Sequence, residues 1–328
     1  MIGKRHHFLI TLLLTTFVVS AHAEKIRTAI PGANLNYLTV YSADERRFFR
    51  DEGFDNETIA IGGPAGIAAL VSGDVDFSGA GGSGLRAAVR GAPLKAIFYQ
   101  TEKPTWYLVV HPSITQGADL KGKKIGVALL GDSEDRFITL YAERAGVAAK
   151  ELTRISLGTG IGDKILGVKT GNVAAVVLDP AGTVVAEREG LRKLTYMGDH
   201  FTLPFQGYVA THQKLAENPS QVKRWIRAMT RSLLFVRDRP EEAADIALRR
   251  LRLRNITKPM LVEAIRSYTR AFPPGVPGVP SAEGVKSILE NELRIPLKLD
   301  KPLAPENFFE LRWAEEVRKE FTAKGTNP

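Results

Sequence analysis

The sequence of 328 residues contains no cysteine. This absence excludes a disulfide scaffold, a thiolate metal site, a nucleophilic cysteine and a lipid anchor on cysteine. No stretch approaches the roughly 20 apolar residues of a membrane-spanning helix. Histidine is also scarce, and His111, His200 and His212 stand apart, without the spacing of a metal site and without a nearby pair of acids. The sequence therefore predicts a protein that is not an enzyme and has no metal or cofactor.

What is present is ordinary globular composition, with 44% hydrophobic and 25% charged residues. The length exceeds the roughly 250–300 residues at which one hydrophobic core stops growing, so two lobes are expected. The formal net charge is +9, and residues 212–272 alone carry 14 Lys and Arg against 6 Asp and Glu. These charges lie on amphipathic helical segments without interleaved aromatic residues, which disfavours a nucleic-acid partner.

The N-terminus has the pattern of an export signal. Lys4 and Arg5 precede the apolar run Phe8–Val19, and Ser20–Ala23 has the small residues that signal peptidase recognises. We expect cleavage after Ala23; a short membrane anchor is the alternative. A mature chain without a cysteine to carry an acyl group is expected to be free in the periplasm.

Short strand-like runs alternate with helical segments over the next 190 residues, which is typical of an open α/β sheet. We expect a strand at 25–30, a helix at 36–50 and a strand at 58–61, and the alternation starts again after Asp119. The two series predict two doubly wound sheets flanked by helices. The last third is helical and includes an expected helix at 281–293.

Two segments partly match nucleotide-binding motifs. Gly117–Lys123 begins like a phosphate-binding loop, but Lys124 stands where a Ser or Thr hydroxyl is needed, and a strand follows instead of a helix. Gly79–Gly84 matches the dinucleotide fingerprint, but it follows the third strand and no suitable acid comes after it. A glycine-rich turn at a helix N-terminus that faces a polar ligand is the better interpretation.

Three blocks in the same order resemble those of a known family. They are Ala69–Phe77, Ala87–Lys95 and Asp119–Val127, within a resemblance that runs from about Lys25 to Arg250. The family comprises extracytoplasmic solute-binding proteins of ABC importers for nitrate, sulfonates, taurine and thiamine-pyrimidine precursors. The resemblance implies a type II two-lobed clamp with a ligand cleft between the lobes, a small-molecule solute, and a membrane permease and an ATPase as partners of a monomeric binding protein.

The family fold also implies two chain crossings, which we place near His111–Ser113 and Gly207–His212. Lobe one would then comprise residues 24–112 and 212–328, and lobe two residues 113–211. The predicted ligand-binding residues lie at strand ends and crossings. They are Asn36, Tyr37, Gly62, Gly63, Pro64, Ala65, Gly82, Ser83, Trp106, Gly131, Asp132, Ser133 and Asp179.

The glycine-rich turns suit an oxyanion, whereas the two aspartates suit an amine or another donor. A sulfonate, a carboxylate or a pyrimidine-like ring remain open as the solute. Two alternatives to transport are an enzyme on the same fold, related to the thiamine-pyrimidine synthases of fungi, and a ligand-sensing module that acts on a separate membrane receptor. These synthases look dependent on a cysteine-rich motif, and this chain contains no cysteine.

Overall fold

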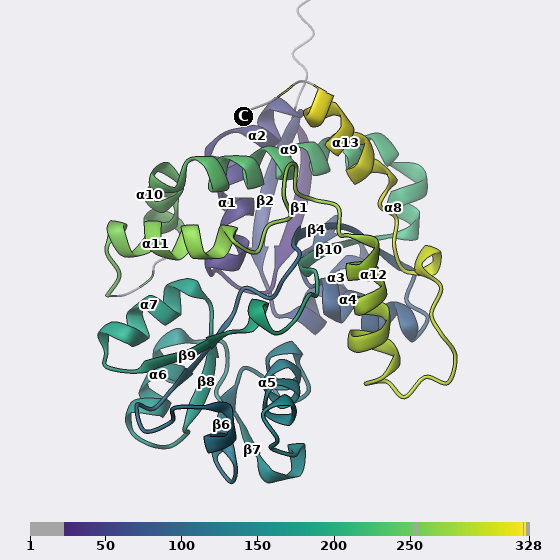
Figure 1. Ribbon diagram of the computed structural model, residues 1–328. Coiled ribbons are helices and arrows are strands. Elements are labelled where there is room, and N and C mark those ends of the chain that lie inside the picture. Colours follow the sequence, from purple (N-terminus) through teal and green to yellow (C-terminus); the bar gives the residue numbers. More distant parts are fainter. Residues whose placement is uncertain (1–22, 252, 254, 324, 326–328) are drawn as a thin grey trace, which may run out of the picture.

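The computed structural model describes residues 23–251, 253, 255–323 and 325. Two lobes, each built on a five-stranded sheet with helices packed against it, lie one above the other in Figure 1. This is the two-lobed α/β architecture that the sequence predicts. Residues 1–22, which contain nearly all of the predicted signal peptide, lie outside the described residues. No helix within the described residues is both long and apolar enough to cross a membrane.

The sheet of lobe one has the strand order β2-β1-β3-β10-β4. Strand β1 pairs in parallel with β2 and β3, whereas β10 runs antiparallel to β3 and β4. The strands are β1 (Glu24–Ile30), β2 (Phe54–Ala60), β3 (Phe77–Ser78), β4 (Leu94–Thr101) and β10 (Phe205–Thr211). The antiparallel β10 is the point at which the chain returns to this sheet from the other lobe.

The sheet of lobe two repeats this plan with the order β7-β6-β8-β5-β9. Strand β6 pairs in parallel with β7 and β8, and β5 runs antiparallel to β8 and β9. The strands are β5 (Tyr107–Val110), β6 (Lys124–Val127), β7 (Thr153–Ser156), β8 (Ala175–Leu178) and β9 (Arg192–Tyr196). Every residue of β5 and β8 is buried, as expected for strands covered on both faces.

The chain crosses between the lobes earlier than the sequence suggests. It leaves the first sheet after Thr101 and enters the second at Tyr107; it leaves the second after Tyr196 and re-enters the first at Phe205. The expected crossings near His111–Ser113 and Gly207–His212 differ because β5 is a continuous apolar run and β10 contains one at Tyr208–Ala210. Such a run indicates a buried strand but not the sheet that it joins.

Helices of lobe two are α5 (Ser133–Arg144), α6 (Ile161–Lys169) and α7 (Pro180–Arg188). The others belong to lobe one: α1 (Leu38–Glu45), α2 (Phe48–Asp51), α3 (Gly63–Ser72), α4 (Gly81–Val89), α8 (His212–Glu217), α9 (Pro219–Asp238), α10 (Pro240–Arg250), α11 (Lys258–Thr269), α12 (Ala282–Ser287) and α13 (Arg312–Ala323). The expected helix at 36–50 is broken, because Arg47 adopts a left-handed φ of 61° between α1 and α2. The expected helix at 281–293 continues from α12 as a π-helical turn, η5 (Ile288–Arg294).

Trp225 on α9 anchors the C-terminal third of the chain to the first sheet. Its ring is fully buried and stacks on Phe77 with 4.5 Å between the ring centroids. Its indole nitrogen donates a hydrogen bond of 3.1 Å to the Thr28 hydroxyl on β1. A buried tryptophan with a satisfied N–H combines a large apolar area with a fixed orientation. Helix α9 is thereby placed against the sheet, and α13 packs on it in turn.

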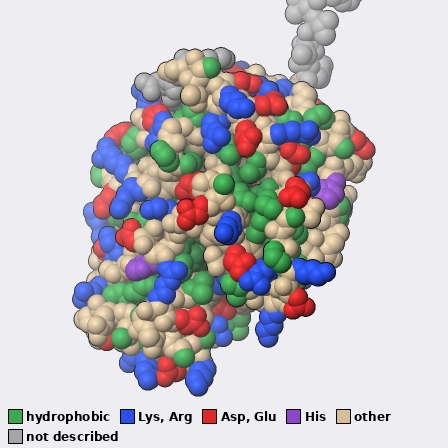
Figure 2. All heavy atoms as spheres, turned by 45° about the vertical axis from the view of Figure 1, so that its right-hand side comes forward, with side chains coloured by type: hydrophobic (Ala, Val, Ile, Leu, Met, Phe, Trp, Pro, Cys, Tyr) green, Lys and Arg blue, Asp and Glu red, His purple; other side chains and the backbone are tan. Residues whose placement is uncertain are grey.

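The basic segment at 212–272 forms ion pairs with acids from the start of the chain. Arg224 contacts Glu24 at 2.6 Å, Arg227 contacts Glu52 at 2.9 Å, and Arg249 contacts Glu45 at 2.9 Å. Figure 2 shows acidic and basic side chains intermixed, with hydrophobic side chains gathered in the middle of the face. Exposed pairs of this kind stabilise by about 0–1 kcal/mol each, so their main effect is to neutralise the local charge.

Asp44 on α1 makes the stability of lobe one depend on pH. Burial raises the pKa of its carboxyl group to about 6, although hydrogen bonds from Asn56 and Thr58 oppose the rise. Between about pH 6 and pH 4 the folded chain holds a proton that the unfolded chain releases. The contribution of this group to stability therefore increases as the pH falls through that window.

A shift of about two pKa units corresponds to roughly 2–3 kcal/mol in the free energy of unfolding. We expect Asp44→Asn to remove this contribution, so that the stability of the variant changes less with pH. Urea unfolding of the wild type and the variant at several pH values between 4 and 7 measures it. Asp300→Asn, at an exposed carboxylate that is not among the groups acting on Asp44, is the control and should keep the wild-type dependence. Parallel stability curves for wild type and Asp44→Asn would contradict the assignment.

Candidate functional site

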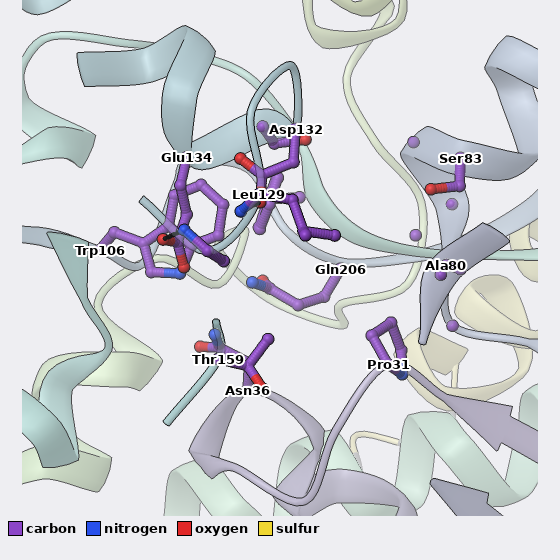
Figure 3. Close-up of a pocket in the computed structure, with 18 of the residues that line it drawn as sticks. Pro31, Asn36, Ala80, Ser83, Trp106, Leu129, Asp132, Glu134, Thr159 and Gln206 are labelled. Atoms are coloured by element: carbon purple, nitrogen blue, oxygen red, sulfur yellow. Dashed lines mark hydrogen bonds between the residues drawn. The ribbon is translucent and has the colours of Figure 1, made fainter. Parts of the chain in front are cut away.

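A cleft of about 280 Å³ lies between the lobes. The segments that follow β1, β2 and β3 line it from lobe one, and those that follow β6, β7 and β8 line it from lobe two. Figure 3 shows Gln206 in the middle of this space, with Ser83 and Ala80 on one side and Asp132 and Leu129 on another. Because ligands of open α/β sheets bind beyond the carboxyl ends of the strands, this cleft is the candidate site.

Lobe one presents two helix N-termini without side-chain caps. Helix α3 begins after Gly62 and α4 after Ala80, and neither preceding residue makes a capping hydrogen bond. Their first-turn amides are left at the positive end of the helix dipole. A Cβ on Gly63 would lie 2.9 Å from the Ser83 hydroxyl, so glycine lets the two helix starts approach each other. This wall favours an anionic or oxygen-rich group.

A second close approach fixes the start of α4. A Cβ on Gly81 would lie only 2.6 Å from the carbonyl oxygen of Gly207 on β10. Since that neighbour is backbone within a paired strand, no side-chain movement would relieve the contact. Glycine at this position therefore seats α4 against the sheet and directs its N-terminus to the cleft.

Lobe two presents three helix N-termini to the cleft, and aspartates cap two of them, at α5 and α7; α6, which begins after Gly160, has no side-chain cap. The Asp132 carboxylate accepts hydrogen bonds from the amides of Asp135 (2.9 Å) and Leu129 (3.1 Å). The Asp179 carboxylate accepts one of 2.7 Å from the Gly182 amide. Burial raises the pKa of both carboxyl groups above the ordinary value, and the backbone hydrogen bonds oppose this. Both aspartates line the cleft, but they also stabilise the starts of α5 and α7.

Asp179 also joins the two lobes. Its second carboxylate oxygen accepts a hydrogen bond of 3.3 Å from the Leu35 amide in lobe one. Nearby, the Tyr107 hydroxyl on β5 bonds the Ser267 hydroxyl on α11. These contacts accompany the packing of α7 against α11, visible on the left of Figure 1. The lobes are therefore held together on this side of the cleft.

Asn36 lies at the centre of a polar network at the crossings. Its side-chain oxygen accepts a 2.8 Å hydrogen bond from Thr105, whose hydroxyl accepts one of 3.3 Å from Gln206. Gln206 in turn accepts from the Thr101 hydroxyl at 3.0 Å. Because its oxygen is held, the Asn36 amide nitrogen remains as the donor, and it has no partner within the described residues. Gln206 has a left-handed φ of 49°, a strain of about 1–3 kcal/mol that is typical of functional sites.

Sequence reasoning missed a buried ion pair in the wall of lobe two. The Lys164 ammonium lies 2.6 Å from the Glu134 carboxylate and donates to the Val177 carbonyl at 3.2 Å, with only 4% of its side chain exposed. Glu134 also accepts from the Ala128 amide at 3.0 Å. Burial raises the pKa of Glu134, and Lys164 opposes the rise. In the sequence, Lys164 is one charged residue of an amphipathic helix, which gives no sign of this role.

An aromatic cluster forms the apolar wall. The ring of Trp106 meets Phe205 edge to face with 4.4 Å between centroids, and it contacts Phe137 at 5.8 Å. Both Trp106 and Phe205 line the cleft, as does Leu129, whose side chain is largely exposed. An apolar body with a few polar groups would fit this combination of walls.

The C-terminal segment supplies a wall that the sequence did not suggest. The π-helical turn η5 contributes Ile288, Glu292 and Leu293 to the cleft. The Glu292 carboxylate lies 3.2 Å from Arg136 of lobe two and 3.9 Å from Arg86 of lobe one. Burial raises the pKa of Glu292, and both arginines oppose the rise. A single carboxylate therefore connects the two lobes on the side opposite Asp179.

Of the predicted ligand-binding residues, all except Ala65 and Gly131 line the cleft. Ala65 lies exposed within α3. Gly131 forms the left-handed turn before α5, with its amide bonded to the Asp135 carboxylate, and it positions Asp132 instead of lining the cleft. The glycine-rich turns and strand ends therefore lie at the cleft, and their part in ligand binding stays a prediction.

Comparison with known proteins places the chain in a family. Residues 34–243 match the family described as NMT1/THI5 like. The chain belongs to this family. A Brucella abortus (strain 2308) protein named as a binding protein is 27% identical over 262 residues, which cover 76% of this chain and 80% of that one. The 4-amino-5-hydroxymethyl-2-methylpyrimidine phosphate synthase of Candida albicans (strain WO-1) is 26% identical over 230 residues, 63% of this chain and 65% of that one.

The fold of this NMT1/THI5-like chain is shared by solved structures. The periplasmic aliphatic sulphonate binding protein SsuA from Escherichia coli superposes with a TM-score of 0.71 at 20% identity, covering 88% of this chain and 92% of SsuA. The resemblance noted from the three sequence blocks is thus confirmed for family and fold.

The buried pair in this cleft wall gives a test of the site's electrostatics. Lys164→Met leaves the buried Glu134 carboxylate without its partner, and we expect a loss of about 3–5 kcal/mol in the free energy of unfolding at pH 7. Adding Glu134→Leu should recover most of that loss. Urea unfolding of the single and double variants measures both values.

Lys169→Met on the same helix is the matched control. Lys169 pairs with Glu189 at 2.5 Å, but 44% of its side chain is exposed, so its loss should cost about 0–1 kcal/mol. Equal effects at positions 164 and 169 would show that the Glu134–Lys164 pair is not buried as described.

Proposed function

We propose that this protein is the extracytoplasmic solute-binding component of an ABC importer. Its solute is a small polar organic compound, namely a sulfonate, a carboxylate or a pyrimidine-like ring, captured by closure of the two lobes. One observation carries the proposal: a cleft lined from both lobes at the strand ends, with hydrogen bonds that already join the lobes beside it. The names of the Brucella protein and of SsuA support it.

Location and partners follow from the same proposal. The predicted signal peptide would deliver the chain to the periplasm, and the closed form would dock on a membrane permease driven by an ATPase. The importer would then receive solute only from a loaded binding protein.

The cleft geometry indicates how a solute would be held. The uncapped amides of α3 and α4, with the Ser83 hydroxyl, would receive its oxygen-rich group. The Asn36 amide nitrogen would donate to a second polar atom, and Trp106 would cover the apolar body. Acidic side chains outnumber basic ones around the cleft, with Asp132, Glu134, Asp179 and Glu292 against Arg86 and Lys164. A solute that also carries a donor or a positive group suits this balance better than a simple inorganic anion.

The similarity to the Candida synthase favours one alternative, an enzyme on the same fold. The described residues contain no group of three or more His, Cys, Asp or Glu side chains placed to hold a metal ion. Incubation with a bound solute separates the two functions, since a binding protein returns its solute unchanged and an enzyme converts it.

Thermal unfolding with a panel of sulfonates, carboxylates and pyrimidines tests the proposal. A bound solute at 100 times its Kd should add about 2.7 kcal/mol of stability. Gly82→Asp places a carboxylate at the start of α4, beside the expected oxygen-rich group, and should weaken an anionic solute about tenfold or more. Ala282→Asp adds the same charge to the first turn of α12, away from the cleft, and should leave affinity unchanged.

Recovery of the solute after incubation distinguishes transport from catalysis. We expect unchanged solute by mass spectrometry. The transport proposal fails if no compound in the panel shifts the melting temperature, or if the bound compound is converted to product.

A further inference from the structure

A second chamber of about 500 Å³ lies between the lobes, next to the cleft. Lobe two contributes α6 and α7 to it, and lobe one contributes residues 32–34 and the loop that contains Leu253 and Ile256. None of the residues predicted from the sequence lines this chamber, and the proposed function does not use it.

Most of the side chains that line the chamber are apolar. Its wall includes Ile165, Leu166, Val185, Leu253 and Ile256. Among the described residues that line it, the two charged ones are Lys169 and Glu189, which pair with each other at 2.5 Å. Leu166 has 59% of its surface exposed, among the largest values for hydrophobic residues in the described chain. With its apolar neighbours on the same wall, this leucine offers apolar surface to an occupant of the chamber.

The chamber and the cleft are adjacent. Asn34, Thr159 and Ile161 line both spaces. In the view of Figure 3, Thr159 lies at the same end of the pocket as Asn36, whose amide is the free polar donor. A solute whose polar group meets Asn36 and α4 therefore has the chamber next to it, on the far side of Thr159.

The volumes agree with an elongated solute. The cleft alone, at about 280 Å³, lies at the lower end of the roughly 300–1,000 Å³ typical of ligand pockets. The chamber adds about 500 Å³ in which apolar groups would lose their contact with water.

We propose that the solute carries an apolar arm, a linear alkyl chain or an aryl group, and that this arm occupies the second chamber. The inference rests on the proposed function and specifies its substrate class: an amphipathic organic acid with its polar group in the cleft and its arm among Ile165, Leu166 and Val185. Leu166 is then a specificity-determining residue.

Calorimetric titration of the full chain with n-alkyl sulfonates and n-alkyl carboxylates, from methyl to octyl, tests the inference. Each methylene that enters the chamber should raise affinity about fourfold. Leu166→Glu places a carboxylate in the chamber wall and should abolish this gain while leaving the affinity for the methyl compounds unchanged. Leu248→Glu, at an exposed leucine on α10 outside both spaces, is the matched control and should keep the gain.

The possible results separate the two levels of the proposal. Binding of the methyl compounds without any gain for longer chains would overturn the inference and leave the proposed function intact. An equal gain in wild type and Leu166→Glu would place the arm elsewhere and would also overturn it. Failure of every compound to bind would contradict the proposed substrate class, and the inference with it. Retained binding of the methyl compounds shows that Leu166→Glu is folded.

Discussion

Two short crossings, residues 102–106 and 197–204, hold the two sheets with the carboxyl ends of their parallel strands directed toward a common space. Everything that lines the cleft depends on this constraint, because turns such as Gly62–Pro64 and Ala128–Glu134 lie far apart in the sequence. The hydrogen bonds through Thr105 and Gln206 fix the crossings themselves. The strained backbone of Gln206 is retained at this junction, where both lobes restrict its conformation.

The two lobes face each other with unequal chemistry. Lobe one offers open helix amides at α3 and α4, whereas lobe two caps the starts of α5 and α7 with Asp132 and Asp179, leaves α6 without a side-chain cap and buries the Glu134–Lys164 pair. Open helix amides are therefore more numerous on the side of lobe one. The proposed solute would place its acidic group against lobe one, with its remaining part directed past Thr159, where the walls become apolar.

The sequence predicts the architecture and most of the cleft, because alternating apolar runs and glycine-rich strand ends are local signals. It predicts neither the break at Arg47 nor the π-helical turn at η5, since tertiary packing, of α2 on β2 and of η5 on α4, overrides helical periodicity there. It also misses Lys164 and Glu292, whose burial depends on partners 30 or more residues away. The sheet to which β5 belongs is likewise decided by long-range pairing and not by its own residues.

Hydrogen–deuterium exchange with and without a solute that binds tests the central claim most directly. The first-turn amides of α3 and α4 lack helical acceptors and side-chain caps, so we expect them to exchange more readily than the amides within these helices. The account predicts that a bound solute protects the amides around Gly63 and Gly81–Ser83, together with the crossings. A tightly bound solute that leaves these amides unprotected, and instead protects a surface away from both lobes' strand ends, would contradict it.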